Sequence, residues 1–374
     1  MSKKYAWLIT GLFCGFLTLF LAAHILLPDR TFSPEENRNL KQFPTLSLEN
    51  ISSGKFMGEF ETYFSEQFAG RDFWIGLKAA SERFSGKQEN NGVYFGTDGE
   101  TLFPSFESPS ADQVDEWLGY VNQLGGNLDV PVYFGLIPGK VTVLSDLLPY
   151  GAPNADELSV IGRAEANCSS AKWIDMTAPL LEHKDEYVFY RTDHHWTTLG
   201  AWYAYQALME GMGLTAVEPG MAPELVSDSF YGTTYSSAGA KWISPDEIWR
   251  RTDDSGVKVT SYFTGLPEEG NLYVEEKLAE KDKYAYFLGG NQPLCVIETE
   301  HTDAPKVLVV RDSYSDCLAP YLTANFSEIH LWDLRYNNMS LKNYVAENGI
   351  DQVVVLYSTA NFCSDYRHLF KLGM

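Results

Sequence analysis

Residues 306–357 read KVLVVRDSYSDCLAPYLTANFSEIHLWDLRYNNMSLKNYVAENGIDQVVVLY, and this stretch decides the fold. Three apolar runs, at 306–310, 328–332 and 352–357, predict strands. The segments between them, 313–324 and 340–348, predict helices. Strands that alternate with helices form right-handed βαβ units, and such units build a parallel sheet. The chain is therefore predicted to have an α/β fold around a central, mostly parallel sheet.

The residues upstream carry signals for further elements. The apolar run Val130–Ile137 ends at Pro138 and predicts a buried strand. Lys140 follows at the carboxyl end of this strand, where open α/β sheets place their ligands, so Lys140 is a candidate substrate contact. Other predicted elements are a hairpin over 93–103 with Asp98-Gly99 at its turn, a helix over 110–125, a short strand over 173–176 and a helix from Thr197 to Gly213.

Two segments flank this framework. Residues 56–84 carry apolar and aromatic side chains at helical spacing, interrupted near Gly70, which predicts two amphipathic helices whose aromatic stripe belongs to a core. Residues 214–300 are rich in glycine, serine, threonine and aromatic residues, and we interpret them as a β-rich insertion. Within this insertion, Gly289-Gly290-Asn291 lets backbone N–H groups approach a ligand closely.

The N-terminus predicts a membrane anchor. Residues 5–27 form an uncharged apolar run, and ~20 such residues cross a bilayer as a helix. Lys3 and Lys4 place residues 1–4 in the cytoplasm and the remainder of the chain outside it. The run is longer than the apolar region of a cleaved signal peptide, which is the rival interpretation. Residues 28–50 then form a juxtamembrane linker, and residues 51–374 the extracytoplasmic domain.

Composition excludes several classes of function. The chain has 374 residues and a formal charge of -22, which opposes binding to nucleic acid or to anionic lipid. Hydrophobic residues make up 45% of it, enough for a sizeable core. Its five cysteines contain no CxxC pair, which excludes a zinc ribbon but leaves one disulfide bridge open.

A serine stands where the first strand of the fold-deciding stretch meets its helix. Ser313 lies in Arg311-Asp312-Ser313-Tyr314, at a turn where backbone N–H groups favour negative charge. An attacking serine needs such a turn, because its attack on a carbonyl creates an oxyanion. Taken alone, the simpler interpretation is that Asp312 and Ser313 cap the helix.

The segment Tyr190-Arg191-Thr192-Asp193-His194-His195-Trp196 supplies the base that a serine requires. Asp193 and His195 are two residues apart, so on an extended segment they point to the same face, while His194 points to the other. Asp193 can then orient His195 toward Ser313, with His194 and Trp196 as supporting residues. A metal site made of Asp193 and both histidines is the alternative, which the divergence of adjacent histidines disfavours.

These residues resemble a known family. Thr192-Asp193-His194-His195-Trp196 matches the signature of the DHHW proteins, and it is similar to the Thr-Asp-x-His-Trp motif of the envelope alginate O-acetyltransferases, which are SGNH-hydrolase-like. The resemblance implies a three-layer SGNH-like fold with a circularly permuted motif order. It also implies that Asp193 orients His195, that His195 is the base, and that Ser313 is the nucleophile.

The chain departs from the family pattern at Arg311, which stands where the family's later block carries glycine before Asp-Ser. The oxyanion-hole donors expected here are the backbone N–H of Ser313 together with Gly290 or Asn291. The guanidinium of Arg311 or of Arg335 is a candidate for binding a substrate carboxylate. Tyr314, adjacent to the serine, joins the substrate-contact candidates.

The resemblance implies a cell-envelope O-acyltransferase, most simply an acetyltransferase, that modifies a surface or secreted polysaccharide without a cofactor or a metal. It implies a bacterial, single-pass membrane location and a membrane-bound O-acyltransferase as the partner that supplies the acyl group. A carbohydrate esterase with the same three residues is the first alternative. A non-catalytic polysaccharide-binding or scaffold protein is the second.

Overall fold

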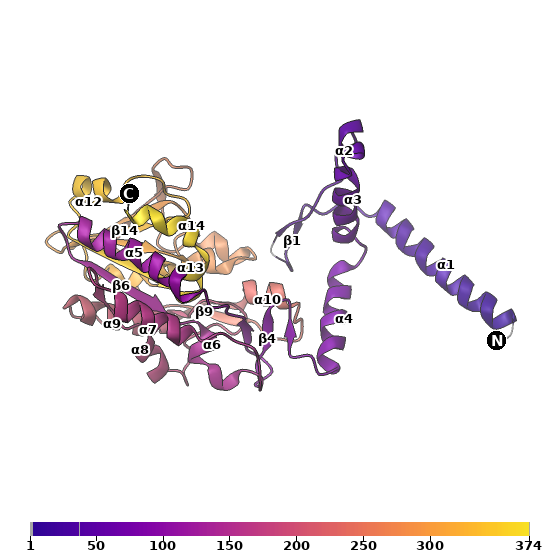
Figure 1. Cartoon of the computed structure of the whole chain (residues 1–374), viewed down its shortest axis with the longest axis horizontal. Coiled ribbons are helices and arrows are strands. Elements are labelled where there is room, and N and C mark those ends of the chain that lie inside the picture. The colour runs from indigo at the N-terminus through magenta and orange to yellow at the C-terminus, as the bar shows by residue number, and fades with distance from the viewer. Residues whose placement is uncertain (1–2, 37, 374) are drawn as a thin grey trace. The chain divides into compact units, whose positions relative to one another are not determined.

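The computed structural model describes residues 3–36 and 38–373, and Figure 1 traces them. They form two compact units. The first comprises Met1–Asn90 with Ser236–Lys241, and the second comprises Asn91–Tyr235 with Trp242–Met374. Residues 51–90, which sequence analysis assigns to the extracytoplasmic domain, lie in the first unit, and the larger compact unit begins at Asn91.

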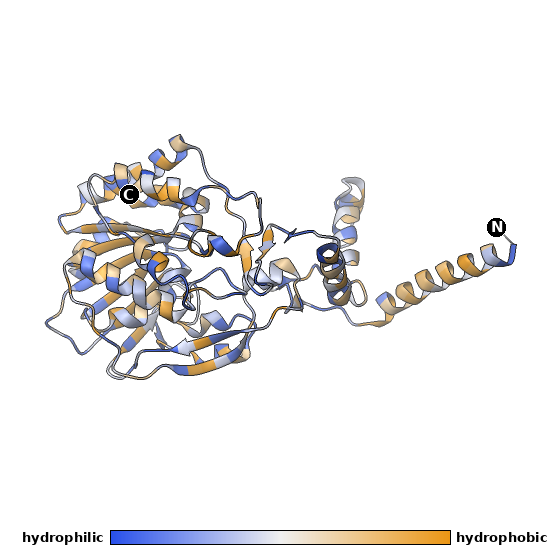
Figure 2. Cartoon of the chain, turned by 90° about the horizontal axis from the view of Figure 1, so that it is seen from below, coloured by the Kyte–Doolittle hydropathy of each residue, from blue (hydrophilic) through white to orange (hydrophobic). Residues whose placement is uncertain are grey.

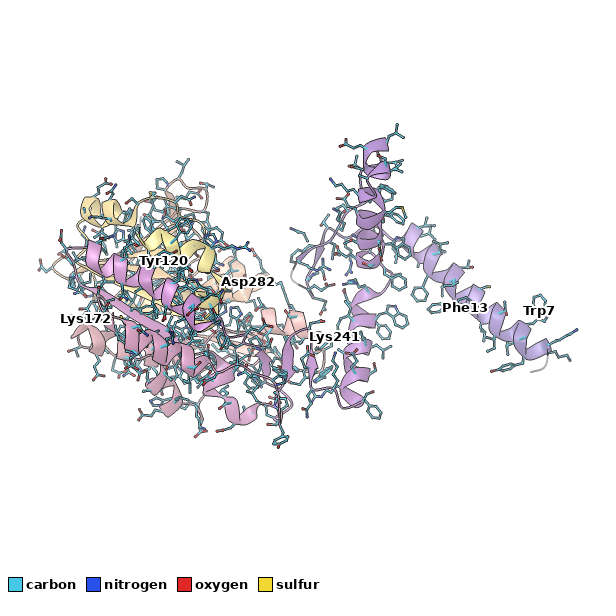
Figure 3. The ribbon with its side chains drawn as sticks, viewed as in Figure 1. Trp7, Phe13, Tyr120, Lys172, Lys241 and Asp282 are labelled. Atoms are coloured by element: carbon cyan, nitrogen blue, oxygen red, sulfur yellow. The ribbon has the colours of Figure 1, made fainter. Side chains whose placement is uncertain are left out.

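The first unit opens with the apolar helix α1 (Lys3–Leu26). Figure 2 shows apolar residues along its length, and in Figure 3 the side chains of Trp7 and Phe13 extend away from its axis. Among the described residues, α1 is the single helix long and apolar enough to cross a membrane. The other elements of this unit are β1 (Phe32–Ser33), β2 (Arg38–Asn39), α2 (Leu48–Ser52), α3 (Lys55–Glu66), α4 (Arg71–Phe84) and β3 (Glu89–Asn90).

Helices α3 and α4 confirm the predicted break near Gly70. This glycine precedes α4 with φ of +69°, a left-handed conformation that suits glycine. The expectation that the aromatic stripe is core is wrong for its end, because Trp74 and Phe84 are 38% and 94% exposed. Helical periodicity shows which side chains share a face, but it does not show whether another element covers that face.

The second unit is built on an eight-stranded sheet with the order β11-β10-β12-β14-β13-β15-β6-β7. Strands β14, β13, β15, β6 and β7 run parallel, whereas β12, β10 and β11 extend one edge in antiparallel fashion. The predicted mostly parallel sheet is confirmed. The strands are β6 (Val132–Ile137), β7 (Lys172–Trp173), β10 (Lys258–Ser261), β11 (Glu268–Gly270), β12 (Leu294–Glu298), β13 (Lys306–Arg311), β14 (Glu328–Trp332) and β15 (Gln352–Ser358).

Side chains alternate between two hydrophobic cores along each central strand. In β13, Val307 and Val309 face one core, and Leu308 and Val310 face the other. The first core is covered by α8 (Thr177–Glu182), α9 (Thr198–Met212) and α11 (Ala319–Leu322). The second is covered by α5 (Ala111–Asn127), α7 (Glu157–Asn167), α12 (Leu341–Asn348), α13 (Thr359–Ser364), α14 (Tyr366–Leu369) and the turn η5 (Phe370–Gly373). Two helical layers therefore enclose the sheet.

Local sequence signals explain where several helices begin and end. Thr197 caps α9 by accepting a hydrogen bond from the N–H of Gly200, and Gly213 ends α9 in the left-handed conformation. Ser110 and Gln113 form a capping box at the start of α5. The predicted hairpin is confirmed by the antiparallel pair β4 (Val93–Phe95) and β5 (Leu102–Pro104).

The helix predicted over residues 313–324 is broken into two short pieces, the turn η4 (Ser313–Asp316) and α11. Pro320 explains the break, because it has no N–H to donate to the carbonyl four residues earlier and it stands in the first turn of α11. Ser313 therefore begins a single tight turn and not a long helix with an extended dipole.

Residues 214–300 do not form a compact unit of their own. Strands β10, β11 and β12 join the central sheet, and β8 (Glu224–Phe230) pairs with β9 (Asp246–Arg250) as a separate ribbon. The remaining elements of the second unit are short: α6 (Lys140–Val143), η1 (Ser145–Leu147), α10 (Thr233–Ala238), which continues into the first unit, η2 (Glu275–Ala279) and η3 (Lys283–Tyr286). All five cysteines are unpaired.

Candidate active site

Three parallel strands, β6, β15 and β13, end at the same edge of the sheet. The residues that follow them there are Lys140 after β6, Thr359 after β15, and Asp312 and Ser313 after β13. Parallel open sheets place their ligand sites outside this edge, because the loops that leave it converge. Ser313 is half-buried at the edge, and Asp312 beneath it is fully buried.

The segment 188–197 folds back on itself to present its central residues to this edge. The N–H of Tyr190 donates to the carbonyl of His195 at 3.2 Å, and the N–H of Thr197 donates to the carbonyl of Val188 at 2.9 Å. A single antiparallel bridge joins Phe189 and Trp196. Residues 191–194 thus form the tip of a tight loop and not an extended strand.

The structure brings Asp193, His195 and Ser313 into one hydrogen-bonded line. Nδ1 of His195 lies 2.5 Å from Oδ1 of Asp193, and Nε2 of His195 lies 2.7 Å from Oγ of Ser313. Both contacts are within the reach expected of a base and its orienting acid. Residues 118 positions apart therefore meet with the geometry of a serine nucleophile and its base.

Asp193 is buried and fully hydrogen-bonded. Its Oδ2 accepts bonds from the N–H and the hydroxyl of Thr233, at 2.7 and 3.0 Å, and its Oδ1 also accepts the N–H of His195 at 3.0 Å. Burial alone would raise its pKa, but the imidazoles of His194 and His195 and these bonds hold the pKa of Asp193 well below its usual range. The carboxylate therefore stays ionised.

Gly232 allows Thr233 to approach so closely. A Cβ at position 232 would lie 2.2 Å from Cβ of Asp193, which no side chain can tolerate. The N–H of Gly232 also donates to Oγ1 of Thr192 at 3.1 Å. Neither Gly232 nor Thr233 was predicted as a site residue, because nothing in the sequence links them to Asp193.

Lys140 is buried, which removes it from the position of a substrate contact that the sequence suggested. Its side chain is 1% exposed, and its ammonium donates to the carbonyls of Tyr190, Arg191 and Asp193 at 3.1, 3.1 and 2.6 Å. These carbonyls belong to the loop tip and need a donor, which the ammonium provides. Burial lowers the pKa of Lys140 to about 8, an effect that the carboxylates of Asp246 and Asp193 oppose.

Asp246 is a second residue that sequence reasoning missed. It is fully buried at the start of β9, where its carboxylate accepts bonds from the N–H groups of Arg191 and Thr192 at 2.9 and 2.7 Å. The hydroxyls of Thr192 and Tyr187 also donate to it, each at 2.5 Å. Lys140 therefore donates hydrogen bonds to carbonyls of the loop, and Asp246 accepts hydrogen bonds from its N–H groups.

Asp312 fixes the turn that carries the serine, as its predicted supporting role requires. Its Oδ1 accepts the N–H of Tyr314 at 3.0 Å. Its Oδ2 accepts the N–H and hydroxyl of Ser358, at 2.8 and 2.7 Å, and the amide of Asn361 at 2.8 Å. The carboxylate thereby ties the end of β13 to the end of the neighbouring strand β15.

Three aromatic side chains join the histidine loop to the serine turn. The indole of Trp196 donates to the carbonyl of Tyr314 at 2.9 Å, and the hydroxyl of Tyr314 donates to the carbonyl of His194 at 2.5 Å. Tyr284 stacks on the imidazole of His195 with ring centres 3.9 Å apart, and its hydroxyl donates to the carbonyl of Ser313 at 3.0 Å. Trp196 and the buried Tyr314 therefore support the site, and Tyr284 is an unpredicted member of it.

The expectation that His194 points away from His195 is wrong. The two ring centres are 3.8 Å apart, because the loop is too tightly folded for the period-two alternation of a strand. Asp193, His194 and His195 do offer three ligand atoms within 4.8 Å of one another. The divergence argument against a metal therefore fails, although the Nδ1 atoms of both histidines are engaged, with Asp193 and with Thr233.

Arg311 is fully buried behind the serine turn and forms an ion pair with Asp316 at 2.9 Å. Two of its nitrogens, Nε and Nη2, have no hydrogen-bond partner among the described residues. Burial raises the pKa of Asp316 to about 6, and the neighbouring Arg311 opposes this rise. A buried guanidinium does not meet a polymeric substrate, so the expected carboxylate contact is not available to Arg311.

Asn291 lies between Arg311 and Arg335. Its Oδ1 accepts from Nη2 of Arg335 at 3.2 Å and from Nη1 of Arg311 at 3.5 Å. The guanidinium of Arg335 is already paired with Asp333, at 2.7 Å. Gly289 and Gly290 lead into Asn291 with φ of +79° and +104°, which side chains rarely tolerate, so these glycines shape the loop that presents Asn291.

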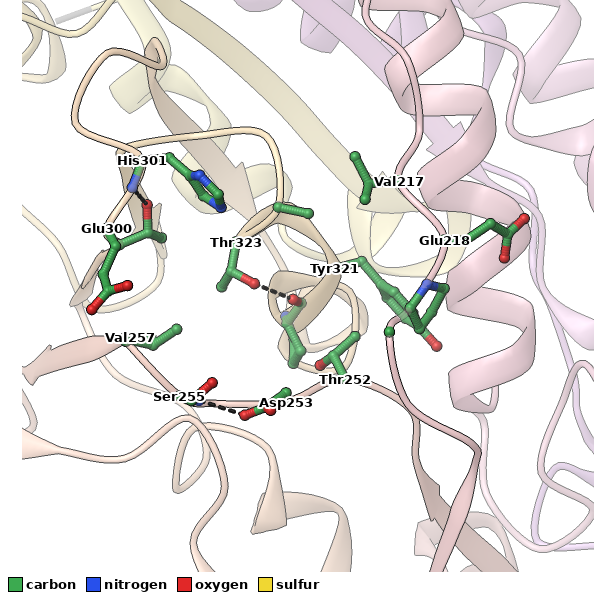
Figure 4. A pocket seen from close by; sticks show the side chains of 16 residues that line it. Val217, Glu218, Thr252, Asp253, Ser255, Val257, Glu300, His301, Tyr321 and Thr323 are labelled. Atoms are coloured by element: carbon green, nitrogen blue, oxygen red, sulfur yellow. Dashed lines mark hydrogen bonds between the residues drawn. The ribbon is translucent and has the colours of Figure 1, made fainter.

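A pocket of about 250 Å³ opens elsewhere on the second unit (Figure 4). Two hydrogen bonds join residues of its lining: the hydroxyl of Thr323 donates to the carbonyl of Pro320 at 2.7 Å, and the N–H of Ser255 donates to Asp253 at 2.6 Å. None of its lining residues belongs to the triad. The pocket is therefore separate from the hydrogen-bonded line at Ser313.

Comparisons with known proteins identify a matching family model and solved structures of similar fold. Residues 165–332 match the family model described as DHHW protein. A crystal structure of a DHHW family protein from Eubacterium siraeum is 23% identical, with a TM-score of 0.65, and the match covers 75% of this chain and 95% of that one. The structure of Bacillus cereus PatB1 with a sulfonyl adduct is 20% identical, with a TM-score of 0.62, and covers 75% and 98%.

No curated protein matches the chain. The two solved structures share its fold, and the family match includes Asp193, His195 and Ser313. The resemblance of this chain to the DHHW proteins, inferred from its Thr192–Trp196 motif, is therefore confirmed over residues 165–332.

Proposed function

We propose that this chain is an O-acyltransferase that moves an acyl group, most simply acetyl, onto a hydroxyl of a polysaccharide. The observation that carries the proposal is the line from Asp193 through His195 to Ser313, with contacts of 2.5 and 2.7 Å. Two features support it further: the serine is half-buried at a ligand-binding sheet edge, and Asp193 remains ionised.

In the proposed first half-reaction, Oγ of Ser313 attacks the carbonyl carbon of the acyl donor while Nε2 of His195 takes the hydroxyl proton. The donor's leaving group departs with that proton, and Ser313 holds the acyl group as an ester. In the second half-reaction, His195 takes a proton from an acceptor hydroxyl, whose oxygen attacks the ester. The new ester leaves, and the proton returns to Ser313.

Both half-reactions form an oxyanion that needs donors. Ser313 is the first residue of η4, so its backbone N–H has no partner within that turn. We propose the amide of Asn291 as the second donor. Its Oδ1 already faces the guanidiniums of Arg311 and Arg335, which turns the NH₂ end away from them. A charged neighbour on one end of an amide also strengthens the donor at the other end.

The same proposal places the protein in a bacterial cell membrane, with α1 as a single-pass anchor and the second unit outside the cytoplasm. The apolar length of α1 supports this location. The acyl group would then be supplied across the membrane, by a membrane-bound O-acyltransferase as the resemblance implies. An esterase would use water as the acceptor with the same residues, so the acceptor distinguishes the two functions.

The test is covalent labelling of the full-length protein in detergent. The protein is incubated with p-nitrophenyl acetate, or with a sulfonyl fluoride in view of the adduct seen in PatB1, and the labelled peptide is identified by mass spectrometry. We expect label on Ser313, none after Ser313→Ala, and a large loss of labelling rate after His195→Ala.

Ser315→Ala is the matched control. Ser315 lies in the same turn, and its buried hydroxyl has no hydrogen-bond partner in the described chain, so its loss should leave labelling intact. Label that stays after Ser313→Ala, or an unlabelled wild-type protein, would rule out the proposed catalysis. Acetyl esters on added saccharide indicate transfer, and free acetate alone indicates an esterase.

A further inference from the structure

His194 is more exposed than the base beside it. Its side chain is 32% exposed, whereas that of His195 is 7% exposed. Tyr284 stacks on one face of the His195 ring at 3.9 Å, so His194, whose centre is 3.8 Å away, must lie over the other face. The base is held between these two rings, and one of the two, His194, reaches solvent.

The hydrogen bonds of Thr233 determine which nitrogen of His194 carries its proton. Oγ1 of Thr233 lies 3.0 Å from Oδ2 of Asp193 and 2.8 Å from Nδ1 of His194. A hydroxyl has one proton, and a carboxylate only accepts, so Thr233 donates to Asp193. Oγ1 must then accept from His194, which requires hydrogen on Nδ1. Nδ1 also lies 3.6 Å from Oδ1 of Asp193, and this carboxylate favours the same tautomer.

The neutral ring therefore carries a lone pair on Nε2. Desolvation of the part of the ring that packs on the protein, followed by repulsion from His195, lowers the pKa of His194 below its usual value, so the ring stays neutral at physiological pH. Among the described residues, Nε2 of His194 has no hydrogen-bond partner. It is a hydrogen-bond acceptor without a donor.

The position of this lone pair follows from the two rings together. Both Nδ1 atoms face the carboxylate of Asp193, at 2.5 and 3.6 Å, and the rings overlap. Both Nε2 atoms therefore lie on the side away from that carboxylate. For His195, this is the side of Ser313. The free lone pair of His194 thus lies beside the place where an acceptor hydroxyl must enter.

We propose that the acceptor is a vicinal diol, and that Nε2 of His194 accepts a hydrogen bond from the hydroxyl next to the one that reacts. The inference rests on the proposed acyl transfer. The reacting hydroxyl gives its single proton to His195, so it has none for His194. A neighbouring hydroxyl on the same sugar ring supplies that proton, and the two imidazoles, whose ring centres are 3.8 Å apart, present two acceptors side by side.

The experiment compares two alcohols as acceptors for the acyl-enzyme that p-nitrophenyl acetate forms on the full-length protein. One is trans-1,2-cyclohexanediol. The other is trans-2-methoxycyclohexanol, whose second oxygen cannot donate. We expect about a tenfold preference for the diol in the wild-type protein, the value of one lost hydrogen bond. Both alcohols react with the same acyl-enzyme, so any effect of a variant on acylation cancels from the ratio of the two transfer rates.

Two substitutions distinguish acceptor binding from a structural role. His194→Asn keeps a donor near Nδ1 for Thr233 but removes the acceptor, and should abolish the preference for the diol among the acyl-enzyme molecules that form. His194→Gln keeps an acceptor near Nε2 and should retain much of the preference. The inference fails if the wild-type enzyme does not favour the diol, if His194→Asn keeps the preference, or if His194→Gln loses it as fully as His194→Asn does. Absence of a burst in the wild-type protein instead defeats the proposed function, and the inference with it.

Discussion

The histidine loop is bound by the buried cation Lys140, and the serine turn is preceded by the buried cation Arg311, but the two cations have different kinds of partner. Among the residues that the structure describes, Lys140 has no ion-pair partner within hydrogen-bonding distance, and its ammonium donates to three backbone carbonyls of the loop. Arg311 pairs with the carboxylate of Asp316 and has two nitrogens without a partner. Lys140 thus positions the backbone of the histidine loop, whereas Arg311 neutralises the buried carboxylate of Asp316.

The difference follows from where each segment lies. The serine turn leaves β13 directly, so the ladder to β15 already places its backbone, and Asp312 completes the attachment. The histidine loop has one isolated bridge and no ladder, so its polar backbone groups need side-chain partners. Lys140 and Asp246 provide them. A catalytic loop without regular structure is therefore positioned by buried charges from other elements.

The largest expected effect is on the histidine side. Asp193→Asn should reduce the rate of Ser313 acylation by about 10⁴-fold, because an amide cannot hold the required tautomer of His195. The measurement is the burst rate with p-nitrophenyl acetate. Circular dichroism and the unfolding temperature check that the fold persists. A loss below tenfold in a folded variant would show that Asp193 does not orient the base.

A smaller effect is expected on the serine side. Arg311→Met leaves the buried carboxylate of Asp316 without its partner and should lower the free energy of unfolding by about 4 kcal/mol. The double change Arg311→Met with Asp316→Leu should recover much of this loss, because an apolar pair can replace a buried ion pair. Denaturant unfolding measures both.

Arg163→Met is the matched control, because Arg163 forms an ion pair with Asp115 on the surface and its loss should change stability by less than about 1 kcal/mol. If Arg311→Met proved as mild as this control, the buried pair would not stabilise the serine turn.

Lys140→Met tests the other cation. The change removes three hydrogen bonds and leaves three carbonyls without this donor, which should lower the unfolding free energy by about 3 kcal/mol. Acylation should slow as well, because the loop carries Asp193 and His195. The exposed Lys342 provides the control Lys342→Met. Equal behaviour of the two variants would contradict the role assigned to Lys140.

The smallest effect concerns Glu157, which holds the turn that carries Lys140. Its Oε2 accepts the N–H of Gly139 at 2.8 Å and the hydroxyl of Thr142 at 2.5 Å. Burial raises the pKa of Glu157 from 4.5 to about 7, although both bonds oppose this rise. Between these values the folded state binds more protons than the unfolded state, so stability falls as pH rises from about 4.5 through 7.

Glu157→Gln should remove this fall in the free energy of unfolding, which is on the order of 2 kcal/mol. The free energy of unfolding should then depend less on pH. Denaturant unfolding at pH 5 and pH 8 measures it. The exposed Glu165→Gln should leave the dependence unchanged. An unaltered pH dependence in Glu157→Gln would mean that another group titrates in this range.

Much of the fold was predictable because patterns of neighbouring residues indicate its strands and helices. The strands at 306–311, 328–332 and 352–358 are continuous apolar runs that two cores bury. Pro320 is a local signal for a helix break as well, and the long helix predicted over residues 313–324 was wrong. The exposed Phe84 shows the limit of such patterns, since periodicity does not reveal what covers a face.

The three residues proposed to carry out the reaction could be predicted from the sequence, but the residues that position them could not. Asp193, His195 and Ser313 carry a motif and a strand-end position, which are local signals. Thr233, Asp246 and Tyr284 act through contacts across 29 to 55 residues of chain, and a single sequence does not indicate such contacts. Lys140 was identified but given the wrong role, because a lysine at a strand end does not show whether its ammonium points outward or inward.

The sequence by itself determined the βαβ order, the apolar N-terminal helix and the three residues that make acyl transfer plausible, since each depends on neighbouring residues. Only the tertiary structure decided that His194 turns toward His195, that Thr233 bridges it to Asp193, and that Lys140 is buried under the loop. Those outcomes depend on how the loop closes. A tight loop satisfies its backbone polar groups with whichever buried donors and acceptors the rest of the fold supplies.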